Sequence, residues 1–242
     1  MMDLQMNSEV QGVEEIPTAY PYYESIISLI KEIDRIHNEF SHQCMERYGL
    51  ALINLKKKQI RHIFNDELQV ISEAFFSLIQ EYTELLVELV ARMTLEYQYV
   101  DLDFRLRIKQ KESIVNKLRY YRLLKKEEGK VAINKCINDL LGFRITLKDF
   151  DHNCKEFDQM CQSIQEEHKI KKENSSKGDY KATHIYFRGE SNSYFPWELQ
   201  IWNEVDASQN EQSHKEHKNK REYINWPNTY KESKEEFEGG VS

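Results

Sequence analysis

The chain has 242 residues, with 34 Lys and Arg against 41 Asp and Glu, and a formal net charge of −7. That length allows one full core or one domain with a helical extension, and the negative charge argues against DNA or an anionic membrane as a partner. No window approaches ~18 uninterrupted apolar residues, so no membrane span is expected. The acidic start is no secretory signal, and the four cysteines form no CxxC pair, which together favour a cytoplasmic location.

The first hundred residues are predicted to be helical. Residues 1–20 are polar and contain Pro17, which indicates a flexible tail, and residues 21–100 are expected to form a helical extension. Between 68 and 93, apolar side chains step by three and four without a break, which predicts one long amphipathic helix. The residues of this seam are Leu68, Ile71, Phe75, Leu78, Tyr82, Leu85 and Leu89. The seam either packs within its own domain or pairs with a second copy, so a homo-oligomer through these helices stays open.

The second half mixes helices and strands. Residues 104–130 hold ten Lys or Arg against three Glu, and Gly129 is a plausible stop for the helix inside them. The predicted order is a helix at 110–127, a strand at 140–147, a helix at 150–168, a polar loop at 171–179, strands at 180–188 and 197–203, a polar helix after 205, and a disordered tail at 229–242. This order predicts an α+β fold with a small sheet backed by helices.

Polar side chains share one face of the predicted strands. Side chains alternate along a strand, so each of the three strands has an apolar face and a polar one. If the strands are neighbours, six polar residues converge: Asp139, Arg144, Tyr180, His184, Glu198 and Gln200. Two carboxylates that meet in this way suit Mg²⁺, which is often completed by substrate phosphates. Taken singly, each residue is also common on solvated strands, so the hypothesis rests on their joint alternation.

A basic segment lies upstream of these strands. Arg107 and Lys109 precede the predicted helix near its positive end, and Ser113 and Lys117 lie four apart on one helix face. Such a cluster can hold a triphosphate. The alternative is a solvated basic face, which is the usual fate of a run of charges.

Four segments together resemble a known family. In order, "RIKQKESIVNKL", "INDLLGFRI", "GDYKATHIYF" and "WELQIW" resemble the successive motifs of RelA/SpoT-type alarmone synthetases, also called GTP pyrophosphokinases. The resemblance covers about 100–225 and implies a synthetase domain at 101–228. It also implies a nucleotidyltransferase-like mixed β-sheet flanked by helices, with the N-terminal helices as an extension.

The resemblance implies an activity and a set of roles. The family transfers the β,γ-pyrophosphate of ATP to the 3′-hydroxyl of GDP or GTP, with Mg²⁺, and releases AMP. The ATP contacts implied are Arg107, Lys109, Ser113, Lys117 and Arg144. The acceptor contacts implied are Tyr180, which looks like the stacking platform for the base, and Lys181, His184 and Gln200. Asp139 and Glu198 look like the catalytic, Mg²⁺-holding pair, with Glu198 orienting the attacking hydroxyl.

The sequence departs from the family pattern at two places. Asp179 separates Gly178 from Tyr180, and Trp202 stands where the family often has Arg, which puts the acceptor in doubt. No His-Asp dipeptide occurs, so a small synthetase without the family's hydrolase domain is expected. His214 and His217 are predicted to be exposed helix residues.

Two other functions remain open. The first is a toxin-type relative that pyrophosphorylates the 3′ end of tRNA and is paired with an antitoxin; Trp202 and the basic "HKEHKNKR" would suit it. The second is a non-catalytic nucleotide-binding regulator. The intact pair of Asp139 and Glu198 argues against the regulator, because a protein that only binds nucleotide can lose its metal ligands without cost.

Overall fold

The computed structural model describes residues 22–49, 53–65, 70–165 and 167–219. The predicted tails at 1–20 and 229–242 lie outside these residues. The elements in chain order are α1 (Tyr23–Tyr48), η2 (Ile60–Ile63), β1 (Phe64–Asn65), β2 (Val70–Ile71), α2 (Glu73–Val90), α3 (Leu95–Gln98), η3 (Val100–Leu102), β3 (Arg105–Ile108), α4 (Lys111–Arg119), η4 (Tyr120–Leu124), α5 (Ile133–Cys136), β4 (Leu141–Leu147), α6 (Lys155–Gln165), β5 (Ile170–Asn174), β6 (Thr183–Phe187), β7 (Trp197–Asn203), η5 (Glu204–Asp206) and α7 (Ala207–Asn219).

The main sheet has five strands in the order β3-β4-β7-β6-β5. β4 and β7 run parallel at its centre, and the other neighbours are antiparallel, so the predicted α+β class with a mixed sheet is confirmed. The three predicted strands are the central ones, and their pairing sets Gly142 opposite Glu198 and Gln200 opposite His184. The polar faces inferred from alternation therefore lie side by side.

Both edge strands of this sheet were missed by the sequence reading. β3 falls in the stretch read as the approach to a helix, and β5 includes all of "KKEN", the first part of the predicted loop. Each strand is short and rich in charged residues, as edge strands often are, because one side of an edge strand faces solvent. β3 pairs with β4, and β5 pairs with β6. These pairings depend on the tertiary structure and cannot be predicted from the local composition of either strand.

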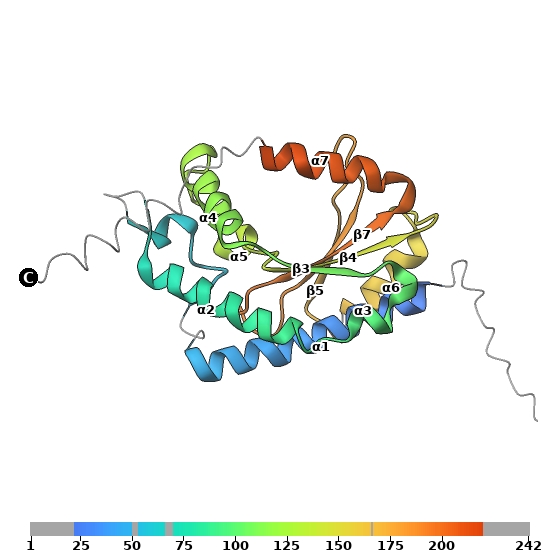
Figure 1. Cartoon of the computed structure of the whole chain (residues 1–242), viewed down its shortest axis with the longest axis horizontal. Helices are drawn as coiled ribbons and strands as arrows, with labels where there is room; N and C mark the ends of the chain where they lie inside the picture. Colours follow the sequence, from blue (N-terminus) through green and yellow to red (C-terminus); the bar gives the residue numbers. More distant parts are fainter. Residues whose placement is uncertain (1–21, 50–52, 66–69, 166, 220–242) are drawn as a thin grey trace, which may run out of the picture.

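Helices cover the two faces of the sheet. Figure 1 shows α1, α2 and α6 along one side, with α7 across the other side. Contacts of α1 with β6, of α6 with β5 and of α2 with β3 agree with this layering. α1 and α2 pack into the same hydrophobic core as the central strands. None of the helices in the described part of the chain is both long and apolar enough to cross a membrane.

The long amphipathic helix begins later than predicted. α2 starts at Glu73, whereas Ile71 belongs to β2 and pairs with Phe64 in a small hairpin; Leu68 lies outside the described residues. Of the predicted seam, Phe75 and Tyr82 are buried in the core together with Ile79 and Leu86. The predicted residues Leu78, Leu85 and Leu89 are only partly buried against that core. This stripe packs within the chain itself, which is the first of the two alternatives left open above.

The basic helix changes its winding before it ends. α4 spans Lys111–Arg119 and passes into a π-helical turn, Tyr120–Leu124, so regular helix stops short of the predicted residue 127. Gly129 has a φ of +79° and donates its backbone N–H to the Tyr121 carbonyl at 2.9 Å. Gly129 thus ends the helical segment, as predicted, and its N–H bonds a carbonyl of the final turn. α6 is likewise shorter than the predicted 150–168.

A buried histidine ties α1 to the loop between β6 and β7. His37 is fully buried, and its Nε2 lies 3.0 Å from the Phe195 carbonyl oxygen. Because a carbonyl only accepts, Nε2 carries the proton and Nδ1 is the bare nitrogen; Nδ1 has no partner among the described residues. Gly189 makes this approach possible, since a Cβ there would lie 2.9 Å from His37 and 2.5 Å from Tyr194.

Protonation of His37 should make the fold sensitive to mild acid. Burial lowers the pKa of His37 from 6.5 to about 4, so the unfolded chain binds this proton first as the pH falls. The stability that neutral His37 contributes is complete above pH 6.5 and is lost between 6.5 and 4. We expect the free energy of unfolding to fall by about 2 kcal/mol from this group between pH 7 and pH 5, as measured by urea unfolding.

The matched control is His37→Gln, which keeps an N–H donor and does not titrate. The variant should lose that part of the acid sensitivity, whatever its stability at pH 7. An identical fall in both proteins would contradict the assignment to His37.

Candidate active site

The first carboxylate, Asp139, lies between two buried lysines. The chain enters β4 just after Asp139, and the Lys109 backbone N–H bonds the Leu140 carbonyl at 2.8 Å, which extends the pairing of β3 with β4. The Lys109 ammonium then lies 2.6 Å from Oδ2 of Asp139, and Lys117, from α4, lies 3.1 Å from Oδ1. Two cations on one carboxylate leave a local excess of positive charge.

The charges of this cluster depend on each other. Burial alone would raise the pKa of Asp139, but Lys117 and Lys109 outweigh it and hold that pKa well below its usual range. Burial lowers the pKa of Lys109, and Asp139 only partly offsets the effect. For Lys117 the attraction of Asp139 overcomes burial and raises the pKa. At neutral pH the cluster is therefore an ionised carboxylate flanked by two ammonium groups.

The second carboxylate, Glu198, is held by two side chains of the same face. It is buried on β7, where Gln200 Nε2 donates to Oε2 at 2.7 Å and His184 Nδ1 lies 3.0 Å from Oε1. Because an ionised carboxylate only accepts, we assign a proton to Nδ1. The other ring nitrogen, Nε2, lies 3.0 Å from the Tyr180 hydroxyl.

Burial would raise the pKa of Glu198, but the hydrogen bond and charge of His184 turn the shift downward, against a smaller upward push from Asp139. Glu198 is accordingly ionised at neutral pH, which suits holding a cation or accepting a hydroxyl hydrogen bond.

Tyr186 belongs to this cluster although it was not among the predicted site residues. Its hydroxyl lies 3.1 Å from His184 Nδ1, and β6 sets Tyr186 opposite Glu198. Burial and the charge of Glu198 raise the pKa of Tyr186, so the phenol stays protonated. The alternation of β6 had already placed Tyr186 on this face.

Arg144 lies on the same face but is engaged elsewhere. Its guanidinium lies 3.5 Å above the Trp202 ring and 2.6 Å from Glu211 of α7. Trp202, the residue that replaces the expected Arg, is 1% exposed. The ring therefore supports Arg144 by a cation–π contact instead of facing an acceptor.

The predicted stacking platform, Tyr180, is also covered by α7. Its ring stacks on His214 at a centroid distance of 5.3 Å and an interplanar angle of 24°. The prediction that His214 is an exposed helix residue is wrong, because the fold of α7 over the sheet carries it onto Tyr180. Burial and the nearby cations Arg144 and Arg107 lower the pKa of His214 to about 4, so the imidazole is neutral. The side chain of His217 lies outside what the structure describes.

Three predicted residues lie at the margin of the cluster. Arg107 is exposed on β3, where it pairs with Gly142. Ser113 is half-buried on α4, one turn before Lys117. Lys181 precedes β6, which begins at Thr183 and not at the predicted residue 180, and its ammonium lies 3.4 Å from Asp206. The structure thus brings Asp139, Lys109 and Lys117 together and joins Glu198, Gln200, His184 and Tyr180, whereas Lys181 stands apart.

The comparisons with known proteins point to one family. Residues 106–223 match the model of a family described as the region found in RelA / SpoT proteins. Over these residues the chain is similar to that region of RelA / SpoT proteins. All the predicted site residues lie within the matched range. Among curated proteins, none matches the sequence.

Solved structures of Bacillus subtilis small alarmone synthetases are similar to the chain. Synthetase 1 bound to its product pppGpp is 19% identical, with a TM-score of 0.35, over 62% of this chain and 82% of that one. Synthetase 2 is 18% identical, with a TM-score of 0.36, over 70% of this chain and 100% of that one. Another structure of synthetase 1 is 17% identical, with a TM-score of 0.33, over 66% of this chain and 84% of that one.

The carboxylate oxygens of the candidate site are of the kind that suits Mg²⁺ better than a softer metal. No group of three or more His, Cys, Asp and Glu within the described residues could hold a metal ion by itself. Mg²⁺ needs only one or two carboxylates when phosphates complete its shell. Asp139 and Glu198 are such a pair, and both are acceptors only.

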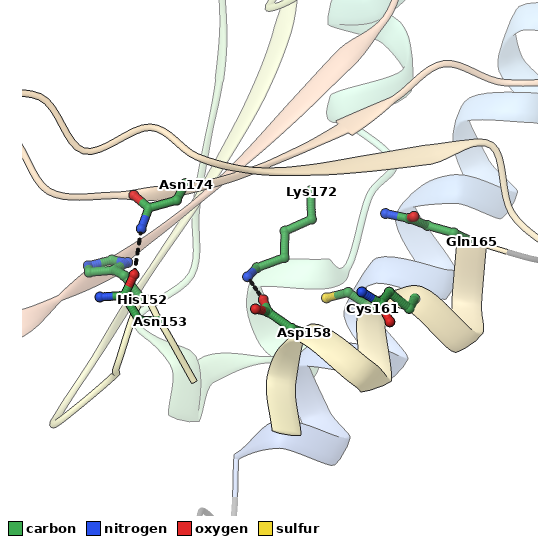
Figure 2. Close-up of a pocket in the computed structure, with 8 residues that line it drawn as sticks. His152, Asn153, Asp158, Cys161, Gln165, Lys172 and Asn174 are labelled. Carbon is green, nitrogen blue, oxygen red and sulfur yellow. Dashed lines mark hydrogen bonds and ion pairs between the residues drawn. The ribbon is translucent and has the colours of Figure 1, made fainter. Parts of the chain in front are cut away.

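A hollow lies on the opposite face of the sheet. It has a volume of about 400 Å³ and is lined by residues of α6, β5 and the loop before α6, including Asp158, Lys172 and Asn174. In Figure 2, Lys172 points to Asp158, and Asn174 bonds Asn153. Lys172 and Asn174 pair with Ile185 and Thr183, whose side chains face away from Glu198. This hollow is therefore separate from the RelA/SpoT site.

Proposed function

We propose that this protein transfers the β,γ-pyrophosphate of ATP to the 3′-hydroxyl of GDP or GTP, giving (p)ppGpp and AMP. The observation that carries the proposal is a pair of carboxylates, Asp139 and Glu198, each held by its own polar partners within the residues that match the RelA/SpoT region. The acceptor oxygen forms a bond to the β-phosphorus of ATP, and the bond from that phosphorus to the oxygen bridging to the α-phosphorus breaks. AMP leaves with the bridging oxygen, and the proton of the 3′-hydroxyl is released to water.

The basic groups would receive the triphosphate. Lys109 and Lys117 carry more positive charge than Asp139 neutralises, and Arg107 adds an exposed guanidinium from β3. Ser113 lies on the same face of α4 as Lys117 and offers a hydroxyl. Phosphoryl-type transfer depends mainly on positioning and on neutralising developing charge, which is what this set supplies.

The acceptor would be oriented by the Glu198 cluster. Because its pKa is lowered, Glu198 is a weak base by itself, so its role is to accept the hydrogen bond of the 3′-hydroxyl and fix its direction. Gln200 and His184 hold the carboxylate, and Tyr180 offers its ring to the base. Asp139 and Glu198 would hold Mg²⁺, which supplies charge neutralisation between the phosphates.

The decisive experiment follows the transferred group. Purified protein with Mg²⁺ and ATP labelled in its γ-phosphate is offered GDP, GTP or bulk tRNA as separate acceptors. We expect label on the guanosine nucleotides together with release of AMP. Label on tRNA alone would replace the proposal with the toxin-type activity, and label on no acceptor would contradict catalysis by this site.

Replacement of Tyr180 with Ala tests the acceptor platform. Stacking contributes about 1–3 kcal/mol per base, so the KM for the acceptor should rise roughly fivefold to a hundredfold while ATP binding stays within twofold of the wild type, roughly the noise of such a comparison. Steady-state kinetics and ATP titration measure the two effects. Tyr97→Ala is the matched control, because Tyr97 is 84% exposed and distant in the sequence. Equal loss of both substrates in Tyr180→Ala would mean that Tyr180 only supports the fold.

A further inference from the structure

One helix contacts three of the candidate substrate residues at once. Asn210, Glu211 and His214 of α7 lie close together on the turn of the helix that faces the sheet. They engage, respectively, the backbone of Lys181, the guanidinium of Arg144 and the ring of Tyr180. α7 therefore covers groups assigned above to both ATP and the acceptor.

Asn210 is the fixed point of this contact. It is fully buried, and its amide accepts from the Lys181 N–H at 2.9 Å and donates to the Lys181 carbonyl at 2.8 Å. The Asn210 amide thus bonds both the N–H and the carbonyl of one residue, as a neighbouring strand would do in a sheet. This clamp keeps α7 docked while other side chains move.

Glu211 and His214 are held less tightly than Asn210. The side chain of Glu211 is 48% exposed and that of Arg144 is 16% exposed, so water reaches their 2.6 Å ion pair from the Glu211 side. An ion pair open to water on one side contributes less free energy than a fully buried one. His214 is half-buried and meets Tyr180 by stacking and Trp202 edge-on at 5.4 Å. Both contacts are weak enough for a nucleotide to break.

The contacts of Glu211 and His214 occupy the two groups that the nucleotides would bind, the Arg144 guanidinium and the Tyr180 ring. A triphosphate and the Glu211 carboxylate are both anions that compete for one guanidinium. A purine base and the imidazole of His214 both require a flat face of Tyr180. A base stacked on the covered face has to displace His214, since the centroid distance of 5.3 Å leaves no room for a third ring.

We infer that Glu211 and His214 set the substrate affinities of this domain by competition, Glu211 against ATP at Arg144 and His214 against the acceptor base at Tyr180. The inference rests on the proposed function, because it assigns Arg144 to ATP and Tyr180 to the acceptor. Each nucleotide displaces one side chain, whereas Asn210 keeps the helix in place. The apparent affinity for each nucleotide is then lower than the exposed site would give.

Binding measurements on three alanine variants test this inference. Glu211→Ala, His214→Ala and the control Gln212→Ala change neighbouring positions of one helix, and Gln212 is exposed. The probes are GDP and α,β-methylene-ATP, in which the bond to be broken is blocked, and isothermal titration calorimetry gives each Kd without turnover.

Competition predicts a selective pattern. Glu211→Ala should lower the Kd for α,β-methylene-ATP roughly twofold to fivefold and leave that for GDP unchanged. His214→Ala should lower the Kd for GDP roughly twofold to tenfold and leave that for the ATP analogue unchanged. Gln212→Ala should match the wild type, and equal thermal unfolding of all four proteins establishes that α7 stays folded.

Other results overturn the inference. A rise of either Kd in the matching variant would make that side chain part of the binding site, and unchanged values would make the contacts incidental. A wild-type protein that binds neither nucleotide would overturn the proposed function, and the inference with it. The two failures are thus distinguishable.

Discussion

Replacement of Glu198 with Gln should reduce pyrophosphate transfer by about 10²–10⁴-fold, the range that a positioned acid–base group contributes. Glutamine has the same shape but lacks the charge, so it neither orients a hydroxyl as well nor attracts a cation. It also presents an amide to Gln200 and His184, which now donate to Glu198 at 2.7 and 3.0 Å. AMP release from labelled ATP, measured with saturating acceptor, reports the effect.

Glu204→Gln is the matched control for this change. Glu204 follows the same strand but is exposed, so the identical substitution there should leave the rate within twofold of the wild type, roughly the noise of such a comparison. Titration with α,β-methylene-ATP should give similar Kd values for all three proteins. Unchanged turnover in Glu198→Gln would remove Glu198 from the site, and lost nucleotide binding would mean that the variant is misfolded.

Replacement of Asp139 with Asn should cost both stability and activity. It leaves Lys109 and Lys117 buried without their counter-charge, and loss of one partner of a buried pair destabilises by about 3–5 kcal/mol. Because the pKa of Asp139 is lowered in the fold, its stabilisation is present above the unfolded pKa of 3.8 and is lost as the pH falls below it. The variant should therefore unfold at lower urea concentration and lose part of the wild-type acid sensitivity.

Two comparisons show whether Asp139→Asn destabilises the fold by leaving buried charges unpaired or by a less specific effect of the substitution. Asp101→Asn changes an exposed carboxylate and should leave the unfolding midpoint unchanged. Lys117→Met added to Asp139→Asn removes one uncompensated ammonium and should recover part of the lost stability, although not the activity. A double variant no more stable than Asp139→Asn would argue against charge imbalance as the cause.

The central part of the sheet was predictable because its signals are local. In β4, β6 and β7 an apolar face alternates with a polar one, and the buried face fixes which side chains point toward the site. The structure reproduces this at Phe143 and Leu199 on one side and at Arg144 and Gln200 on the other. The edge strand β3 alternates in the same way but over only four residues, and β5 carries three charged residues in succession, so pairing with a neighbour decides the form of both.

The residues of the candidate site also differ in whether local sequence patterns predict their arrangement. Glu198, Gln200 and His184 follow from alternation plus a single pairing of neighbouring strands. The three-way contact of Asp139 with Lys109 and Lys117 needs residues separated by 30 and 22 positions to meet. No local pattern specifies how such charges will pair, since the geometry of two buried ammonium groups depends on the whole surrounding fold.

The sequence by itself determined which chemical groups are present and which of them share a strand face, because the periods of helices and strands are set by backbone geometry. The tertiary structure alone decided that α7 lies across the site. Glu211 reaches Arg144 across 67 positions of chain, and His214 meets Tyr180 because Asn210 is clamped to Lys181. A polar helix with a weak apolar face carries no periodic signal for its partner, so only the completed sheet fixes where it docks.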